Sequence, residues 1–171
     1  MKYYIDFDGV ILDTEELLFG ELRRKTDCKK LSEMEKIRYV QEADWNYILN
    51  NSPVINDSIY YLKNIDFNSS VILTKVHSLT NEGSAKVNWI RRNGLKQSII
   101  LVPYDVKKSD MAMAGGNILI DDCLRNLDDW FNNGGYPILF DINDDNYDSW
   151  GKYNNKGYRR VRSLSCCLRN R

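Results

Sequence analysis

Two aspartates, Asp6 and Asp8, stand in the segment Asp6-Phe7-Asp8-Gly9-Val10, directly after a short apolar run. Side chains alternate along an extended strand, so these two carboxylates face the same way. Where the chain turns, one carboxylate can attack phosphorus while the other protonates the leaving oxygen and later takes a proton from water. Gly9 leaves room for a phosphate group to approach the backbone. Asp-Gly is also a common turn, so the segment taken alone fits either an ordinary turn or a site of covalent phosphoryl transfer.

Further polar side chains follow later apolar runs. They are Thr74, Lys75, Lys107, Lys108, Asp121 and Asp122. Because the carboxyl ends of parallel strands lie at one edge of a sheet, we expect these groups to converge with Asp6 and Asp8. Each close pair of carboxylates costs about 4 kcal/mol at an effective dielectric of about 20, so the cluster requires a cation. Oxygen-only ligands favour a hard ion, and magnesium suits phosphoryl transfer.

The elements that must position these residues alternate between strand and helix. Short apolar runs predict five strands, at residues 2–7, 70–73, 98–102, 117–120 and 137–140. Helical patterns lie between them, at residues 56–64, 81–93 and 124–133. Asn56 is the expected N-cap of the first helix, Gly94 the C-cap of the second, and Phe131 an inward-facing residue of the third. The alternation predicts an α/β fold with a mostly parallel five-stranded sheet.

Residues 14–52 hold two helical patterns and no convincing strand. The segment Ser32-x-x-Glu35 is a capping box, and apolar residues follow it at helical spacing. We therefore expect a small helical cap, inserted after the first strand and lying over the carboxyl edge of the sheet. Trp45 and Tyr47 could stack on a nucleobase there, although helix packing is the more ordinary role for both.

Composition favours one soluble domain. The chain has 171 residues, of which 43% are hydrophobic, and no apolar run approaches the ~20 residues that cross a bilayer. Acidic residues interrupt the N-terminal apolar stretch, unlike a signal peptide. The four cysteines contain no CxxC pair, and Cys166 and Cys167 are neighbours, which argues against a disulfide framework. We expect a soluble, cytoplasmic protein without membrane contact.

Formal net charge is zero, but the end of the chain is basic. No acid follows Asp148, and seven cations occupy the last 23 residues: Lys152, Lys156, Arg159, Arg160, Arg162, Arg169 and Arg171. Two interpretations are open for this tail, which we place at residues 150–171 after a core at 1–149. One is a poorly ordered terminus; the other is a contact with nucleic acid or an acidic partner.

Taken together, these segments resemble the haloacid dehalogenase (HAD) superfamily over residues 1–12 and 53–141. Its first motif, DxDG[VT], is similar to Asp6-Phe7-Asp8-Gly9-Val10, and its second to Val71–Thr74. Its third and fourth are similar to Lys108–Ala112 and Ile118–Asp122. The stretch Ile120–Phe140 resembles the 5'(3')-deoxyribonucleotidase-like branch. The resemblance implies a three-layer, Rossmann-like core.

The resemblance also implies roles for individual residues. Asp6 would be the nucleophile and Asp8 the general acid and base. Thr74 would bind phosphate, with Gly9 and Lys75 as further substrate contacts. Lys108, rather than Lys107, would steady the phosphoaspartate.

Magnesium would be held by the Asp6 carboxylate, the Asp8 backbone carbonyl and the pair Asp121-Asp122. Asp122 is favoured as the direct ligand because Asp121 stands where many relatives have glycine; Asp121 would then support the site without touching the ion.

The implied substrate is a phosphate monoester, typically a nucleoside monophosphate and often a deoxy one. Sugar phosphates and polynucleotide 3'-phosphates are alternatives, and the basic tail mildly favours the latter. A hydroxyl acceptor other than water remains open, as does a catalytically silent binding module of the same fold. The sequence indicates no particular oligomeric state.

Overall fold

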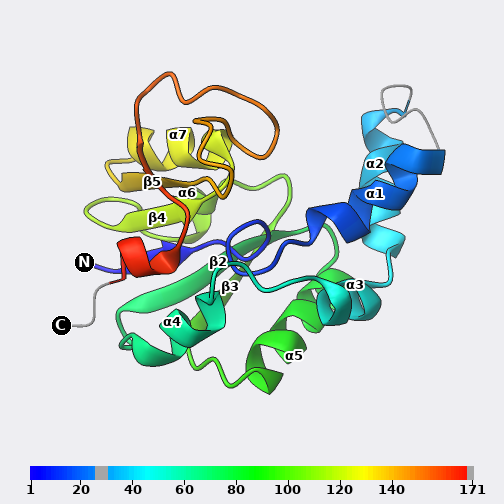
Figure 1. Ribbon diagram of the computed structural model, residues 1–171, viewed down its shortest axis with the longest axis horizontal. Helices are drawn as coiled ribbons and strands as arrows, with labels where there is room; N and C mark the ends of the chain where they lie inside the picture. Colours follow the sequence, from blue (N-terminus) through cyan, green and yellow to red (C-terminus); the bar gives the residue numbers. More distant parts are fainter. Residues whose placement is uncertain (26–30, 169–171) are drawn as a thin grey trace.

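The computed structural model describes residues 1–25 and 31–168. Within them, six parallel strands form one sheet in the order β3-β2-β1-β4-β5-β6 (Figure 1). The strands are β1 (Tyr3–Ile5), β2 (Ser70–Val76), β3 (Ser98–Pro103), β4 (Ile118–Asp121), β5 (Tyr136–Phe140) and β6 (Arg159–Val161). The predicted α/β class and parallel sheet are confirmed, and β1 lies centrally between β2 and β4.

The sixth strand, β6, comes from the segment that we considered as a poorly ordered tail. Leu139 of β5 pairs with Arg160 of β6, and the Asp141 N–H donates to the Val161 carbonyl at 2.9 Å. A short 3₁₀ helix, η3 (Leu164–Cys166), follows. The prediction of five strands is therefore wrong, and so is that of a disordered terminus for residues 159–168. A three-residue strand with two exposed arginines carries no apolar pattern. Arg169 and Arg171 lie outside the described residues.

Helices cover both faces of the sheet. They are α4 (Ser58–Asn64) and α5 (Ser84–Arg92) on one side, and α6 (Lys108–Met111) and α7 (Leu124–Asn132) on the other (Figure 1). Side chains alternate along each strand, so Ile5 packs in the same cluster as Trp89 of α5, while Tyr4 packs with Trp130 of α7. This is a three-layer core. No helix in the described ranges is long and apolar enough to cross a membrane.

The insertion after β1 contains three helices rather than two: α1 (Glu15–Lys25), α2 (Glu33–Glu42) and α3 (Trp45–Asn51). Figure 1 shows α1 and α2 side by side, away from the sheet, whereas α3 lies against α5. The capping box is present, because the Ser32 hydroxyl accepts from the Glu35 N–H and the Glu35 carboxylate from the Ser32 N–H. Trp45 is 1% exposed, so it packs inside rather than offering its ring to a ligand.

Three local predictions are corrected. Asn56 does not cap α4: the cap position is Asp57, with a φ of 58°, and the Asn56 amide donates instead to the Arg162 carbonyl. The helix expected at residues 81–93 is split into a π-helical turn, η2 (Leu79–Gly83), and α5. Phe131 is 53% exposed, because its neighbour Trp130 fills the buried position of α7.

Candidate active site

Three carboxylates meet at the carboxyl edge of the sheet. Asp6 directly follows β1, Asp121 is the last residue of β4, and Asp122 comes next. The Asp6 N–H donates to the Ile120 carbonyl at 2.9 Å, which holds the two strand ends together. Each of the three acids offers a carboxylate oxygen, and these oxygens lie within 4.8 Å of one another. Parallel pairing thus brings together residues more than 100 positions apart in the chain.

Lys108 is the cation of this cluster. It is the first residue of α6 and is buried, and its Nζ lies 2.6 Å from Asp121 Oδ2 and 2.9 Å from Asp6 Oδ1. Burial alone would lower the pKa of Lys108, but the carboxylates of Asp121 and Asp6 outweigh it and raise the pKa above its ordinary value. Lys107 is exposed and faces Asp129 instead, at 3.4 Å. Of the two candidate lysines, Lys108 alone reaches Asp6 in this geometry.

One ammonium does not balance three carboxylates. Burial raises the pKa of Asp6 to about 7; Lys108 opposes this rise, and the charges of Asp121 and Asp8 add to it. The pKa of Asp122 is also well above its ordinary value, first because of burial and then because of Asp121 and Asp6. A group of oxygen donors with excess negative charge is the environment that suits a hard divalent cation. The residues present therefore fit magnesium.

The two adjacent aspartates are differently engaged. Asp121 is fully buried; its Oδ1 accepts from the Cys123 N–H at 2.8 Å and the Asn126 amide at 3.2 Å, while Oδ2 faces Lys108. Asp122 reaches over Gly9, where an added Cβ would lie 2.1 Å from Asp122 Oδ2. Gly9 also has a φ of +69°, which disfavours any other residue. The left-handed backbone and the nearby carboxylate together favour glycine here, a constraint additional to the phosphate approach that the sequence suggested.

Asp8 is held at both carboxylate oxygens. The Thr14 hydroxyl donates to Oδ1 at 2.8 Å, and the Lys86 ammonium lies 2.5 Å from Oδ2. Thr74, fully buried in β2, accepts from Lys86 at 3.3 Å and donates to the backbone carbonyl of Lys75. Thr74 and Asp8 therefore share one lysine as a neighbour.

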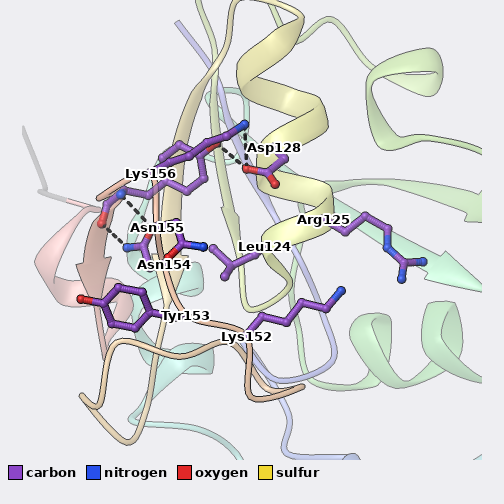
Figure 2. Close-up of a pocket in the computed structure, with 9 residues that line it drawn as sticks. Leu124, Arg125, Asp128, Lys152, Tyr153, Asn154, Asn155 and Lys156 are labelled. Atoms are coloured by element: carbon purple, nitrogen blue, oxygen red, sulfur yellow. Dashed lines mark hydrogen bonds and ion pairs between the residues drawn. The ribbon is translucent and has the colours of Figure 1, made fainter.

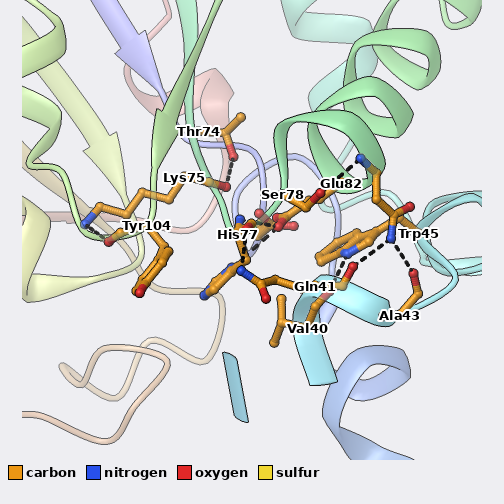
Figure 3. Close-up of polar contacts among 12 residues, drawn as sticks. Val40, Gln41, Ala43, Trp45, Thr74, Lys75, His77, Ser78, Glu82 and Tyr104 are labelled. Carbon is orange, nitrogen blue, oxygen red and sulfur yellow. Dashed lines mark hydrogen bonds and ion pairs between the residues drawn. The ribbon is translucent and has the colours of Figure 1, made fainter. Parts of the chain in front are cut away.

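Lys75, which was expected to contact phosphate, has a backbone carbonyl as its hydrogen-bond partner in this structure. Its ammonium donates to the Tyr104 carbonyl at 3.1 Å, in the loop after β3 (Figure 3). Burial lowers the pKa of Lys75, and repulsion from Lys108 lowers it further. His77, two residues later, stacks on the Tyr104 ring with centroids 5.1 Å apart. In this geometry Lys75 is tied to the β3 loop and His77 is a packing residue.

The inserted helices are tied to the loop after β2. The Gln41 amide donates to the His77 carbonyl at 3.0 Å, and the Asn81 amide donates to the carbonyls of Gln41 and Ala43 at 2.9 and 3.0 Å (Figure 3). The Glu82 carboxylate accepts from the His77 N–H at 2.7 Å. These bonds connect the end of α2 with the turn η2, which leads into α5.

Sequence reasoning missed Thr14, Glu82 and Lys86. Glu82 and Lys86 are four residues apart, and such a pair is usually a solvated ion pair on a helix surface. The signal that could have revealed them is the position of Lys86 on the apolar side of α5, beside the buried residues Trp89 and Ile90. A lysine within an apolar stripe is unusual and implies a buried partner.

Comparison with solved structures finds several hydrolases of similar shape. A haloacid dehalogenase-like hydrolase from Streptococcus pneumoniae has a TM-score of 0.64 and 13% identity, covering 96% of this chain and 95% of its own. A magnesium-bound HAD hydrolase from Bacillus subtilis has a TM-score of 0.62 and 14% identity, covering 99% and 98%. A HAD-superfamily hydrolase from Ehrlichia chaffeensis has a TM-score of 0.55 and 12% identity, covering 96% and 92%.

The chain has the haloacid dehalogenase fold. No protein-family model matches the sequence, and comparison with curated proteins finds no match. At these identities the likeness establishes the HAD fold alone. In this HAD fold, the candidate site residues lie on or directly after the adjacent central strands β1, β2 and β4.

The raised pKa of Asp6 predicts how stability of the metal-free protein depends on pH. The folded protein holds the Asp6 proton up to about pH 7, whereas an aspartate in the unfolded chain, with its ordinary pKa of 3.8, loses its proton near pH 4. Between these values the folded state binds more protons, so its stability falls as pH rises. Urea titration with a chelator measures the free energy of unfolding of wild type and of Asp6→Asn. We expect the difference, wild type minus variant, to decrease from pH 4 to pH 7. A difference that rises over this interval would contradict the burial of an uncompensated Asp6.

Proposed function

We propose that this chain is a magnesium-dependent phosphatase, which hydrolyses phosphate monoesters through an aspartyl-phosphate on Asp6. The observation that carries the proposal is the grouping of Asp6, Asp121 and Asp122 around Lys108, with Asp8 beside them and held at both oxygens. These carboxylates repel one another, so holding them close is costly. With one buried ammonium among them, they suit the binding and transfer of a phosphoryl group.

In the first step the Asp6 carboxylate attacks phosphorus, and the bond from phosphorus to the ester oxygen breaks. Asp8 donates a proton to that departing oxygen. Lys108 and the Phe7 N–H both contact Asp6 Oδ1, at 2.9 and 2.8 Å, and so fix the orientation of the nucleophile. Thr74 would hydrogen-bond a phosphate oxygen.

In the second step a water molecule attacks phosphorus while Asp8 takes its proton, which releases phosphate and restores the Asp6 carboxylate. Magnesium, held by Asp6, Asp122 and the Asp8 backbone carbonyl, would neutralise negative charge on the phosphate oxygens. Asp121, occupied by Lys108 and by the Cys123 N–H, would support the site without touching the ion.

The proposed substrate is a nucleoside monophosphate, with the resemblance of residues 120–140 as its main support. An aromatic pair beside the acids adds to it. The ring centroids of Phe19, in α1, and Trp150 are 6.5 Å apart, and Trp150 is 67% exposed. Ser149, next to Trp150, donates its N–H to the Asp122 carbonyl at 3.4 Å. A flat base could stack on such a ring, whereas the buried Trp45 offers none.

Phosphate release by the wild-type protein tests the proposal. The panel would contain ribo- and deoxyribonucleoside monophosphates, sugar phosphates and p-nitrophenyl phosphate, each with magnesium and with a chelator. We expect magnesium-dependent release, with a nucleotide as the best substrate. A sugar phosphate as the best substrate would refute the nucleotide assignment and keep the phosphatase. No release by folded protein from any ester would refute the phosphatase and favour a silent binding module.

A second candidate, hydrolysis of a polynucleotide 3'-phosphate, is favoured by a basic pocket next to the acid pair. The pocket has a volume of about 520 Å³ and lies between the start of α7 and residues 152–158 (Figure 2). Lys156 is paired with Asp128 at 3.1 Å. Arg125 and Lys152 extend in the same direction in Figure 2 and have no ion-pair partner among the described residues. A neighbouring backbone phosphate would find two free cations there.

The double variant Arg125→Ala/Lys152→Ala separates the two substrates. If the pocket binds a strand, this variant should raise KM for an oligonucleotide 3'-phosphate and lower the dependence of log KM on log salt by about one per cation removed. Turnover of a mononucleotide should not change. Lys2→Ala/Lys96→Ala is the matched control, because these exposed lysines precede β1 and β3 at the opposite edge of the sheet. Equal effects of the two double variants would remove the polynucleotide candidate.

A further inference from the structure

Lys86 is a fully buried lysine that none of the steps above uses. It lies in α5, and its ammonium reaches four oxygen atoms. These are Asp8 Oδ2 at 2.5 Å, Glu82 Oε1 at 2.6 Å, the Lys75 carbonyl at 3.0 Å and Thr74 Oγ1 at 3.3 Å. The side chain has no exposed surface. Such saturation of a buried ammonium fixes its position within the protein.

The partners of Lys86 differ in what they can do. Glu82 is itself buried, with a side chain 3% exposed, and its second oxygen accepts from the His77 N–H at the end of β2. Glu82 is therefore the permanent counter-charge of Lys86. Asp8, in contrast, has a side chain that is 34% exposed, stands two residues after Asp6, and is close enough for its charge to raise the pKa of Asp6. Of the two carboxylates that Lys86 holds, only Asp8 is placed to meet a substrate.

The orientation of Asp8 is set from two independent elements. Thr14, just before α1, donates to one carboxylate oxygen, and Lys86, from α5, to the other. The turn η2 positions Glu82, and through it Lys86, because this π-helical turn is anchored to the inserted helices by Asn81. π-Helical turns are uncommon and frequently occur at functional sites. Removal of Lys86 would leave Asp8 held from the α1 side alone.

We propose that Lys86, neutralised by Glu82, is a positioning residue that holds the Asp8 carboxylate in the direction from which it exchanges protons with the leaving oxygen and with water. The inference rests on the proposed phosphatase function and adds a residue to it. Lys86 acts through Asp8 and does not touch the reacting atoms. The alternative is that the ion pairs only stabilise the fold.

The two readings differ in how activity depends on the leaving group. A nucleoside leaves as an alkoxide and needs the proton of Asp8, whereas p-nitrophenolate leaves without one. In Lys86→Met we expect kcat for a nucleoside monophosphate to fall about 100-fold, as for a misplaced catalytic group, with little change in KM. With p-nitrophenyl phosphate, the variant should release a rapid burst of about one nitrophenolate per enzyme and then turn over slowly. Water activation still needs Asp8, so the second step is the slow one.

Because Lys86→Met leaves the buried Glu82 and the partly exposed Asp8 without their cation and could fail to fold, Lys86→Met/Glu82→Gln is measured beside it. This double variant removes one positive and one negative charge together and should show the same burst. Asn88→Met is the control, since Asn88 is an exposed residue of the same helix; it should behave as wild type. Circular dichroism reports whether each variant is folded.

A double-mutant cycle with Asp8→Asn distinguishes a positioning role of Lys86 from a purely stabilising one. If Lys86 acts through Asp8, Lys86→Met should matter little once Asp8 is already replaced. In the Asp8→Asn background it should lower steady-state turnover of p-nitrophenyl phosphate by less than about 3-fold, a much smaller loss than the same substitution causes in the wild-type background. An equal loss in both backgrounds, or loss on both substrates without a burst, would overturn the positioning role. Wild-type protein without any phosphatase activity would instead overturn the proposed function itself, so the two failures are distinct.

Discussion

Asp6→Asn is expected to lower kcat for every phosphate monoester by roughly 10⁵-fold or more, the scale seen when a catalytic nucleophile is removed. An amide cannot form the covalent intermediate, and the variant also lacks one of the two carboxylates, Asp6 and Asp122, that would hold magnesium. Substrate binding through Thr74 and Lys108 remains, so KM should change far less than kcat. Phosphate release under saturating magnesium measures the effect.

Acid-quenched protein gives a second measurement of the role of Asp6. With p-nitrophenyl phosphate, whose leaving group needs no proton, mass spectrometry should find a phosphorylated aspartate in Asp8→Asn, which is slow to hydrolyse it, and none in Asp6→Asn. The control is Asp105→Asn, an exposed aspartate of the loop after β3, which should be fully active. If Asp6→Asn retained substantial turnover, Asp6 would not be the nucleophile.

Lys108→Met is expected to lower the free energy of unfolding by about 3–5 kcal/mol, the cost of removing one partner from a buried ion pair. The ammonium of Lys108 has no exposed surface and lies between Asp121 and Asp6. Without it, three carboxylates at the strand ends face one another with no positive charge between them. Urea denaturation in the presence of a chelator measures the loss.

Magnesium should restore part of this stability, because a cation among the same oxygens replaces the missing charge and binds the folded state alone. The matched control is Lys107→Met: Lys107 is exposed and 3.4 Å from Asp129, so its loss should change stability by no more than about 1 kcal/mol. Equal stability of the two variants would mean that the buried pairs of Lys108 do not form in solution.

Much of the site could be predicted because its signals are local. Asp6, Thr74 and Asp121-Asp122 each stand where an apolar run ends, and parallel strands bring such ends to one edge of a sheet. The α/β class followed from the alternation of strand and helix patterns. The exact ends of elements were less accessible: β2 continues to Val76, so Thr74 and Lys75 lie within it. The backbone pairing with β3 extends that strand beyond its apolar residues.

Other features depended on contacts that no local pattern encodes. β6 is held by pairing with β5 and by the cover of η3, not by hydrophobic alternation of its own. The Lys75 ammonium turns to the Tyr104 carbonyl, 29 residues away in sequence. Asn56 was expected to cap α4, but its amide bonds the Arg162 carbonyl, 106 residues away. In each case a partner distant in sequence outweighs the local preference.

The sequence by itself indicated the acid pair and the parallel sheet on which it stands, because residue type and strand ends suffice for these, whereas Asp6 as nucleophile came from the resemblance to the HAD superfamily. Only the tertiary structure decided which charged side chains pair with one another. Lys86 and Asp8 are 78 residues apart, and they pair only because α5 packs against the face of the sheet that contains Ile5 of β1. Likewise, residue type alone does not separate Asp121 from Asp122; in the structure the buried Lys108 pairs with Asp121, whereas Asp122 lies over Gly9. Burial makes an unpaired charge costly, so the fold selects the partners.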